Sequence, residues 1–156
     1  MHKTHHLILI AALASAAATA VLAGQATAAS QSTLSGTFHE DSRTLTFVKE
    51  SGGNLYFNLQ DTHTYTGSLT GTDVFTGTGI IKRDGSVSWH GRSTFTGTLA
   101  GCGTGTIVFA ADGGGDSLTG PAHCHQEMID GTKGWEVNLF LEGTTTDLTY
   151  GGSYSC

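Results

Sequence analysis

The sequence predicts an all-β protein, a closed antiparallel β-barrel of about eight strands, with a β-sandwich as the alternative arrangement. Apolar and polar residues alternate with a period of two along most of the chain, and no long segment repeats apolar residues at helical spacing. Clusters of turn-forming residues separate the alternating runs at regular intervals. Threonine is abundant, and its branched side chain suits a pleated strand. The 23 glycines favour a tightly curved sheet, because glycine permits a strand to bend.

The N-terminal segment, residues 1–28, is expected to be a secretory signal peptide. Lys3 gives a cationic start, residues 7–23 are small or apolar apart from one serine and one threonine, and Ala26-Thr27-Ala28 fits a cleavage site. An uncleaved membrane anchor is the alternative, but the apolar stretch is shorter than the roughly 20 residues that a spanning helix needs. We therefore expect cleavage after Ala28 and secretion of residues 29–156 as a single β-barrel domain.

The mature chain is expected to be acidic. Removal of Lys3 with the leader changes the formal charge from −6 to −7. The few basic side chains are scattered, and neutralising phosphates requires grouped lysines and arginines. We therefore expect no nucleic-acid partner and, once the leader is removed, no association with a membrane.

The first half of the domain contains alternating runs that are typical of half-buried strands. These runs span residues 34–39, 43–50, 55–59, 65–70, 74–83 and 86–99. The turn clusters between them include Ser51-Gly52-Gly53-Asn54 and Asp84-Gly85, and the second is a strong hairpin signal. The clearest run is the last, in which one face carries Val87, Trp89, Gly91, Ser93, Phe95, Gly97 and Leu99.

The second half follows the same pattern. Residues 104–111 read as a strand, and Asp112-Gly113-Gly114-Gly115 is expected to turn the chain. A strand over residues 117–129 follows and ends at Asp130-Gly131. Residues 144–156 close the domain after one further strand, whose buried face carries Trp135, Val137, Leu139 and Leu141.

Several short motifs resemble a family of small, uncharacterised bacterial proteins with an allene-oxide-cyclase-like β-barrel. The motifs are the Gly-Thr runs at residues 66–72 and 96–99, Arg83-Asp84-Gly85, Gly91, residues 101–109, and Tyr150-Gly151-Gly152-Ser153-Tyr154. The resemblance implies a closed antiparallel barrel of about eight strands. It implies no established activity, and it assigns no catalytic residue to this sequence. Residues 121–133 depart from the family pattern.

Three cysteines remain after export, and an oxidising compartment allows one disulfide among them. If the expected hairpin centres on Gly113, Cys102 and Cys124 lie opposite each other, so we expect these two to be bonded. A hairpin centred one residue later would shift the pair by two, and Cys124 with Cys156 is the alternative. With Cys102 and Cys124 bonded, Cys156 would be a free terminal thiol or a point of dimerisation.

One local pattern could bind a metal ion. Residues two apart in a strand share a face, so His123, His125 and Glu127 could together hold zinc or copper. The alternative is a solvated polar face, because the alternation turns Ala122 and Cys124 inward and the histidines outward. We therefore expect no cofactor, with zinc or copper as the weaker hypothesis.

The remaining titratable residues do not identify a catalytic site. His39, His63 and His90 lie on separate strands, and each, taken alone, is expected on the surface. Asp61 and the Glu40-Asp41 pair lie near strand ends, where the sequence does not reveal their separation. No nucleophile elbow, phosphate-binding loop or zinc-protease motif occurs. The catalytic residues are thus unknown.

The aromatic residues suggest how the barrel could act. A barrel of about eight strands is either filled by its side chains or holds one small ligand. We expect a non-catalytic module that binds a small apolar molecule, or a partner, with Trp89, Phe95, Phe109 and Trp135 as the candidate ligand-binding residues. A cyclase- or isomerase-like enzyme using the same cavity is the alternative, as is a secreted structural or inhibitor protein with a filled barrel.

Overall fold

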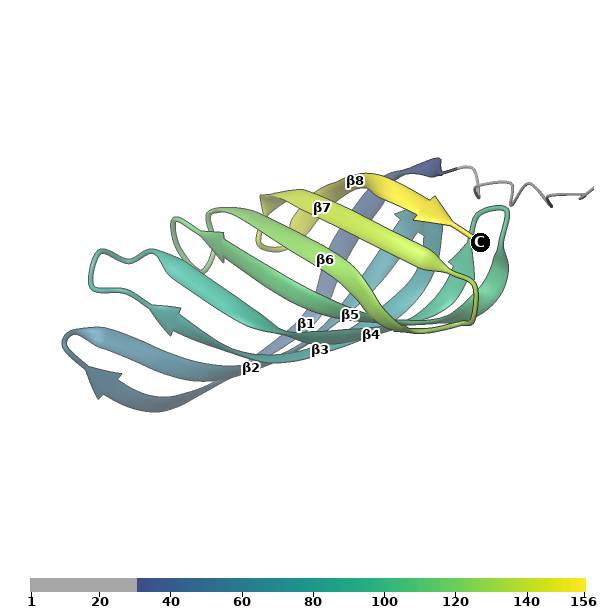
Figure 1. The fold of residues 1–156 in the computed structure, drawn as a ribbon. Helices are drawn as coiled ribbons and strands as arrows, with labels where there is room; N and C mark the ends of the chain where they lie inside the picture. Colours follow the sequence, from purple (N-terminus) through teal and green to yellow (C-terminus); the bar gives the residue numbers. More distant parts are fainter. Residues whose placement is uncertain (1–30) are drawn as a thin grey trace, which may run out of the picture.

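The structure, a computed structural model, describes residues 31–156, and the expected signal peptide lies outside the described residues. Each strand pairs antiparallel with the next, and the first strand also pairs with the last, which closes the barrel (Figure 1). The strands are β1 (Ser32–Ser51), β2 (Asn54–Gly67), β3 (Leu69–Ile81), β4 (Val87–Leu99), β5 (Gly103–Gly115), β6 (Pro121–Gly131), β7 (Glu136–Thr144) and β8 (Asp147–Ser155). The predicted all-β barrel is confirmed. Residues 31–156 contain no helix of the length and hydrophobicity needed to cross a membrane.

Some strands are longer than the alternating runs suggested. The runs over residues 34–39 and 43–50 belong to one strand, β1, in which Asp41 is an extra residue that shifts the register. The run over residues 55–59 continues to Gly67 as β2. A β-bulge bends a strand without ending it, so polar residues at a bulge imitate a turn in the sequence.

The turn expected at Asp112-Gly113-Gly114-Gly115 is wrong. These residues end strand β5, and the chain turns at residues 116–120 instead. A Cβ atom on Gly113 would lie 2.5 Å from the indole ring of Trp89 on β4. Glycine is therefore needed at this position for the close approach of a ring, and not for a turn.

The cysteine pairing also differs from the prediction. Because the chain turns later than expected, the register of β5 and β6 places Cys124 opposite Gly113. Cys102 is bonded instead to Cys156, with 5.9 Å between the Cα atoms. The predicted Cys102–Cys124 bond is therefore wrong, and Cys156 is not free to link a second copy. Within residues 31–156, Cys124 is the free cysteine.

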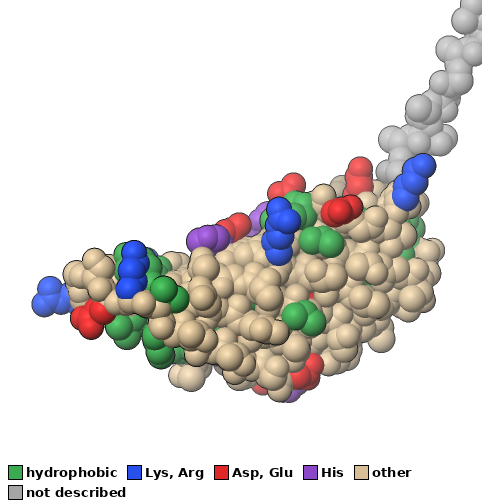
Figure 2. Space-filling view, turned by 90° about the horizontal axis from the view of Figure 1, so that it is seen from below, with side chains coloured by type: hydrophobic (Ala, Val, Ile, Leu, Met, Phe, Trp, Pro, Cys, Tyr) green, Lys and Arg blue, Asp and Glu red, His purple; other side chains and the backbone are tan. Residues whose placement is uncertain are grey.

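The barrel has two different ends. The disulfide end holds the turns after β2, β4 and β6, the C-terminus and the Cys102–Cys156 bond. The cavity end holds the turns after β1, β3, β5 and β7, and its β1–β2 and β3–β4 hairpins project beyond the other strands (Figure 1). Hydrophobic side chains lie exposed on the projecting end (Figure 2), and Phe47, Val48 and Leu55 of the β1–β2 hairpin are among the exposed ones.

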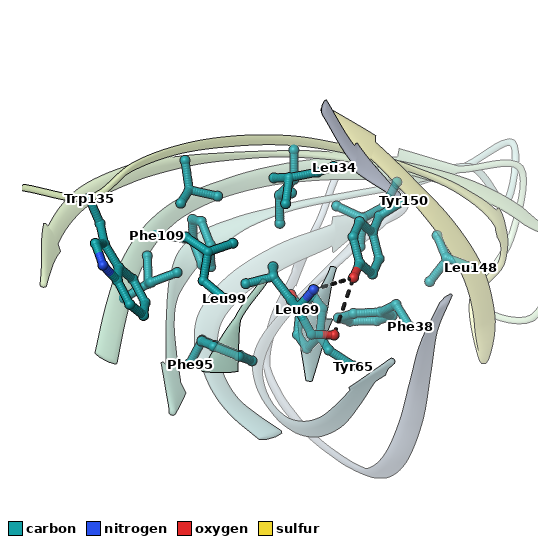
Figure 3. Packing of buried hydrophobic residues seen from close by; sticks show 14 of the residues in the cluster. Leu34, Phe38, Tyr65, Leu69, Phe95, Leu99, Phe109, Trp135, Leu148 and Tyr150 are labelled. Carbon is teal, nitrogen blue, oxygen red and sulfur yellow. Dashed lines mark hydrogen bonds between the residues drawn. The ribbon is translucent and has the colours of Figure 1, made fainter. Parts of the chain in front are cut away.

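Apolar side chains fill the disulfide end. Five aliphatic side chains there are at most 1% exposed: Leu34, Leu69, Leu99, Ile107 and Leu139. Burying a side chain of this size stabilises the fold by about 1.5–3 kcal/mol. The hydroxyl of Tyr150 accepts a hydrogen bond from the Leu69 N–H at 2.7 Å within this core (Figure 3). The polar atom of this ring therefore satisfies a backbone group and leaves the core apolar.

Candidate functional site

The bulge at Asp41 brings two charged side chains of β1 to the barrel interior. In a regular strand, Glu40 and Arg43 would point to opposite faces, because they are three residues apart. The extra residue turns Arg43 back to the inward face, where its side chain is 23% exposed and that of Glu40 is 10% exposed. A local irregularity of the strand thus places an acid and a base side by side inside the barrel.

Strand β2 adds two buried titratable groups next to them. Its inward positions run in one phase from Phe57 through Asp61 and His63 to Tyr65. Asp61 lies opposite Arg43 in the strand register and is 4% exposed, while His63 is 6% exposed. Buried charges are costly unless they are paired, so the neighbours of these groups decide their state.

Asp73 on β3 holds the imidazole of His63. The Nδ1 atom of His63 lies 2.6 Å from Asp73 Oδ1, and the Ser93 hydroxyl on β4 donates to Asp73 Oδ2 at 2.5 Å. The Tyr65 hydroxyl lies 3.3 Å from that same Oδ2 atom and 2.9 Å from Gln126 Oε1 on β6. Asp73 is only 1% exposed. These contacts fix the orientation of the imidazole ring, because its Nδ1 atom is committed to Asp73.

Asp61 lies between His63 and Arg43 without a close partner. Its Oδ2 atom is 3.9 Å from His63 Nε2 and 3.7 Å from Arg43 Nε, and both distances exceed a hydrogen bond. Burial raises the pKa of Asp61 from 3.8 to about 6, against the opposing charge of the Arg43 guanidinium. Within residues 31–156, Asp61 Oδ1 and Arg43 Nε are both buried and lack a hydrogen-bond partner.

The guanidinium of Arg43 links three segments at the cavity end. Its Nη1 atom donates to the Leu118 carbonyl at 3.0 Å, in the loop after β5. Its Nη2 atom donates to the Thr145 carbonyl at 3.3 Å, in the turn after β7, and also pairs with Glu40. The two terminal nitrogens are therefore occupied, which leaves Nε as the donor without a partner.

A cavity of about 60 Å³, partly open to solvent, adjoins this cluster. Its polar lining consists of Arg43, Asp61, His63, Cys124, Gln126 and Thr145. Its apolar lining consists of Phe38, Leu45, Phe57, Leu59, Phe75, Val87, Trp89, Ala111, Leu118, Ala122, Leu141 and Leu148. An apolar pocket with a few convergent polar groups and a carboxyl of raised pKa is typical of a small-molecule site.

Three side chains of the cluster have the spacing of metal ligands. Glu40, Asp61 and His63 each offer one ligand atom, and these atoms lie within 4.8 Å of one another. However, the guanidinium of Arg43 already pairs with Glu40 and lies beside Asp61. Because the chain supplies its own cation here, the arrangement favours a polar group of a ligand over a metal ion.

The predicted ligand-binding aromatic residues are divided between the two ends of the barrel. Trp89 lines the cavity. Phe95, Phe109 and Trp135 belong instead to the apolar core that extends to the disulfide end, and Phe95 and Phe109 are fully buried there (Figure 3). The part of the barrel that these three residues occupy is therefore filled, and open space remains beside Trp89.

The three candidate metal ligands on β6 lie outside the barrel. His123 and Glu127 are exposed, and His125 is half-buried. His125 Nε2 is 2.9 Å from Asn138 Oδ1, and its ring stacks on Phe140 at 4.7 Å between centroids. The structure thus gives His125 two contacts on the neighbouring strand β7, and His123 and Glu127 belong to a polar outer face.

Cys124 faces the cavity, yet its environment disfavours the reactive thiolate. Burial raises the pKa of this thiol to about 12, and the carboxylates of Asp112 and Asp73 add to the effect. The thiolate is the nucleophilic form of cysteine. Cys124 therefore serves as a part of the cavity wall and not as a nucleophile.

The sequence reasoning missed the buried cluster, although one signal pointed to part of it. The expectation that His63 lies on the surface is wrong, because Asp61 and His63 continue the inward phase of Phe57 and Leu59. Extending that phase by four residues would have placed both groups inside the barrel. Their convergence with Asp73 depends on the register between β2 and β3, which the sequence did not define.

Comparisons with known proteins support the fold. A scan against models of protein families finds no match, and a search of curated proteins finds none either. Among solved structures, the chain is similar to a protein of unknown function from the DUF3224 family of Shewanella oneidensis MR-1. The similarity has a TM-score of 0.65 and 18% sequence identity, and it covers 80% of this chain and 97% of the other. At this level of identity the likeness extends to the barrel fold of a small bacterial protein of unknown function.

Proposed function

We propose that this protein binds a small, largely apolar molecule in the cavity of its barrel. The observation that carries the proposal is a partly open apolar cavity that meets a buried polar cluster on one wall. The apolar walls would supply most of the affinity, since burial of apolar surface is the main favourable term in such sites. The polar cluster would fix the orientation of the ligand.

The size of the cavity limits what can enter it. About 60 Å³ is room for roughly four to six water-sized groups. One end of a ligand would therefore occupy the cavity, and the rest would extend along the half-buried Leu45 and Leu118 toward solvent. An unbranched or lightly branched aliphatic chain meets this requirement.

A pair of neighbouring alanines tests the proposal. Ala111 is buried in the cavity wall, whereas Ala110 on the same strand faces outward. Ala111→Leu should fill the cavity and abolish binding of 1-hexanol or its isomer 1-methoxypentane, observed as chemical-shift changes in ¹⁵N-labelled protein. Ala110→Leu should leave binding intact. Binding that survives Ala111→Leu, or the failure of both compounds to bind the unaltered protein, would contradict the proposal.

Export of the protein remains part of the proposal. The Cys102–Cys156 bond supports it, because disulfides persist mainly in oxidising compartments. The mass of protein recovered from the culture medium should correspond to a chain that begins at Ala29 and contains one disulfide. A product that retains Met1 would contradict the cleavage.

Proton transfer is a second candidate function, favoured by the orientation of His63. With Nδ1 held by Asp73, Nε2 is the ring nitrogen left to face Asp61 and the cavity. A neutral imidazole held in this way can accept a proton from a carbon next to a carbonyl and return it to another position, as an isomerase does. The likeness to allene oxide cyclases remains a prediction, and so does any cyclase activity.

Deuterium exchange tests the second candidate without knowledge of the substrate. The protein should catalyse exchange of the protons next to the carbonyl of 2-hexanone in D₂O, faster than free imidazole at the same concentration. His63→Gln should abolish this exchange, whereas His39→Gln should not, because His39 lies on the surface beside Asp147. Equal exchange in the presence of both variants would contradict a catalytic role for His63.

A further inference from the structure

We propose that the cavity selects ligands that carry a neutral hydroxyl group, held between Arg43 Nε and Asp61 Oδ1. The inference rests on the proposed binding of a small molecule and names the chemical class of that molecule, a small aliphatic alcohol. It concerns two buried side-chain atoms to which the fold gives no hydrogen-bond partner.

The two atoms form a complementary pair. Arg43 Nε is a donor and Asp61 Oδ1 an acceptor, and both belong to side chains that line the cavity. Arg43 Nε is 3.7 Å from the other oxygen of the same carboxylate, so Oδ1 also lies near it. A hydroxyl group donates one hydrogen bond and accepts others, so a single hydroxyl can satisfy both atoms.

Most of the neighbouring polar groups are already engaged in hydrogen bonds, which leaves Arg43 Nε and Asp61 Oδ1 as the buried pair for recognition. The terminal nitrogens of Arg43 bond to Leu118, Thr145 and Glu40. Asp73 accepts a hydrogen bond from the Ser93 hydroxyl and pairs with His63 Nδ1. Within residues 31–156, Arg43 Nε and Asp61 Oδ1 are thus the buried side-chain atoms that lack a partner, and His63 Nε2 and Asp61 Oδ2 lie 3.9 Å apart beside them.

The charges around the pair disfavour ionic ligands. An ammonium group could bind Asp61, but it would lie next to the guanidinium of Arg43 and would leave Arg43 Nε unsatisfied. A carboxylate could accept from Arg43, but it would face the carboxylates of Asp61 and Glu40. An ether oxygen could accept from Arg43 Nε but has no proton for Asp61. Among these groups, the hydroxyl alone matches both atoms without adding a charge.

Four probes of similar length separate these possibilities. The probes are 1-hexanol, its isomer 1-methoxypentane, hexylammonium and hexanoate, each titrated into ¹⁵N-labelled protein at about pH 8, where the amine and the acid are ionised. We expect 1-hexanol to bind about 5- to 160-fold more tightly than the ether, because a buried donor or acceptor left unsatisfied costs about 1–3 kcal/mol. Both ionic probes should bind more weakly than the alcohol.

The outcomes distinguish the two proposals. If none of the probes binds in the cavity, the proposed function itself fails. If the ether binds as tightly as the alcohol, or an ionic probe binds more tightly, the cavity binds small molecules but the hydroxyl inference is overturned.

Two substitutions test whether Asp61 and Arg43 cause the preference for the alcohol over the ether. Asp61→Leu should bring the affinities for 1-hexanol and 1-methoxypentane within about twofold, while apolar binding persists. Arg43→Met should do the same, and it serves as the second variant if Asp61→Leu fails to fold. Glu142→Leu on the exposed face of β7 is the matched control and should leave the preference unchanged. A preference for the alcohol that survives both cavity variants would also overturn the inference.

Discussion

The two ends of the barrel use the same strands for opposite purposes. At the disulfide end, apolar side chains such as Leu69 and Leu99 exclude solvent completely, and the Tyr150 hydroxyl bonds to backbone atoms. At the cavity end, charged groups lie inside the barrel, and Arg43 and Asp61 each keep a buried polar atom without a partner. Such atoms cost stability and persist where a fold also has to bind something. The comparison assigns stabilisation of the barrel to one end and, under the proposed function, ligand binding to the other.

The largest expected effect concerns the disulfide end. Replacing both Cys102 and Cys156 by serine should lower the free energy of unfolding by about 4 kcal/mol, because the bond closes a loop of 54 residues. Urea unfolding measures this loss. Binding of 1-hexanol at the other end should change less than twofold, since the bond is not part of the cavity lining.

A reducing agent provides the control for this prediction. It should destabilise the unaltered protein to the same extent as the double substitution and have no effect on the doubly substituted protein. If the double substitution abolished binding while leaving the protein folded, the two ends would not be independent, and the division of roles would be wrong.

The next effect in size concerns the cavity end and depends on pH. The pKa of Asp61 is about 6 in the folded protein, above its ordinary 3.8. Between these values the folded protein binds more protons than the unfolded chain, so this group's contribution to stability is present below about pH 4 and is lost as pH rises through about 6. Asparagine does not ionise, so Asp61→Asn removes the decrease in stability that ionisation of Asp61 causes. The variant should be more stable than the unaltered protein at neutral pH, by on the order of 3 kcal/mol, and equal to it near pH 4.

Asp84 on the β3–β4 turn serves as the control, because its replacement by asparagine should change stability at neutral pH in the opposite direction. Hydrogen bonds from the Ser86 hydroxyl and backbone N–H lower the pKa of Asp84. Its ionised form therefore stabilises the turn at neutral pH, and Asp84→Asn should weaken the fold there. If Asp61→Asn proved less stable than the unaltered protein at neutral pH, Asp61 would be a stabilising partner of Arg43. The ionised carboxylate at the cavity end would then not lower the stability of the fold.

The disulfide end was the more predictable from the sequence. At this end the alternation along β4 toward Phe95 and Leu99 identified the inward face, because aromatic and aliphatic residues mark a buried face directly. The disulfide itself was not predicted correctly, since the pairing of Cys102 depends on where a distant C-terminal strand ends. Periodicity reveals which face of a strand is buried but not which strands meet across the barrel.

The cavity end was harder to predict for a related reason. Asp61 and His63 occupy inward positions within β2, whereas the sequence suggested a surface position for His63 and a strand end for Asp61. Arg43 reaches the interior only because of the bulge at Asp41, which no simple alternation encodes. A functional cluster breaks the rule that buried positions are apolar, so pattern-based reasoning fails most readily at such a site.

The smallest expected effect concerns Trp89, which lies between the cavity and the apolar core. Gly113→Ala would place a methyl group 2.5 Å from the indole of Trp89, so the ring would have to move. Overpacking of this kind costs about 1–3 kcal/mol, measured by thermal or urea unfolding. Because Trp89 lines the cavity and also packs against the apolar core, the displaced ring should weaken binding of 1-hexanol as well.

Gly151→Ala on β8 is the matched control, because an added Cβ there has no neighbour closer than 4.0 Å. This variant should retain both stability and binding. If Gly113→Ala lowered stability but left binding unchanged, Trp89 would belong functionally to the filled core, and the ligand would be held by the polar wall and the remaining apolar residues. If it weakened binding as expected, the indole would be the shared boundary at which the stable end of the barrel shapes the binding end.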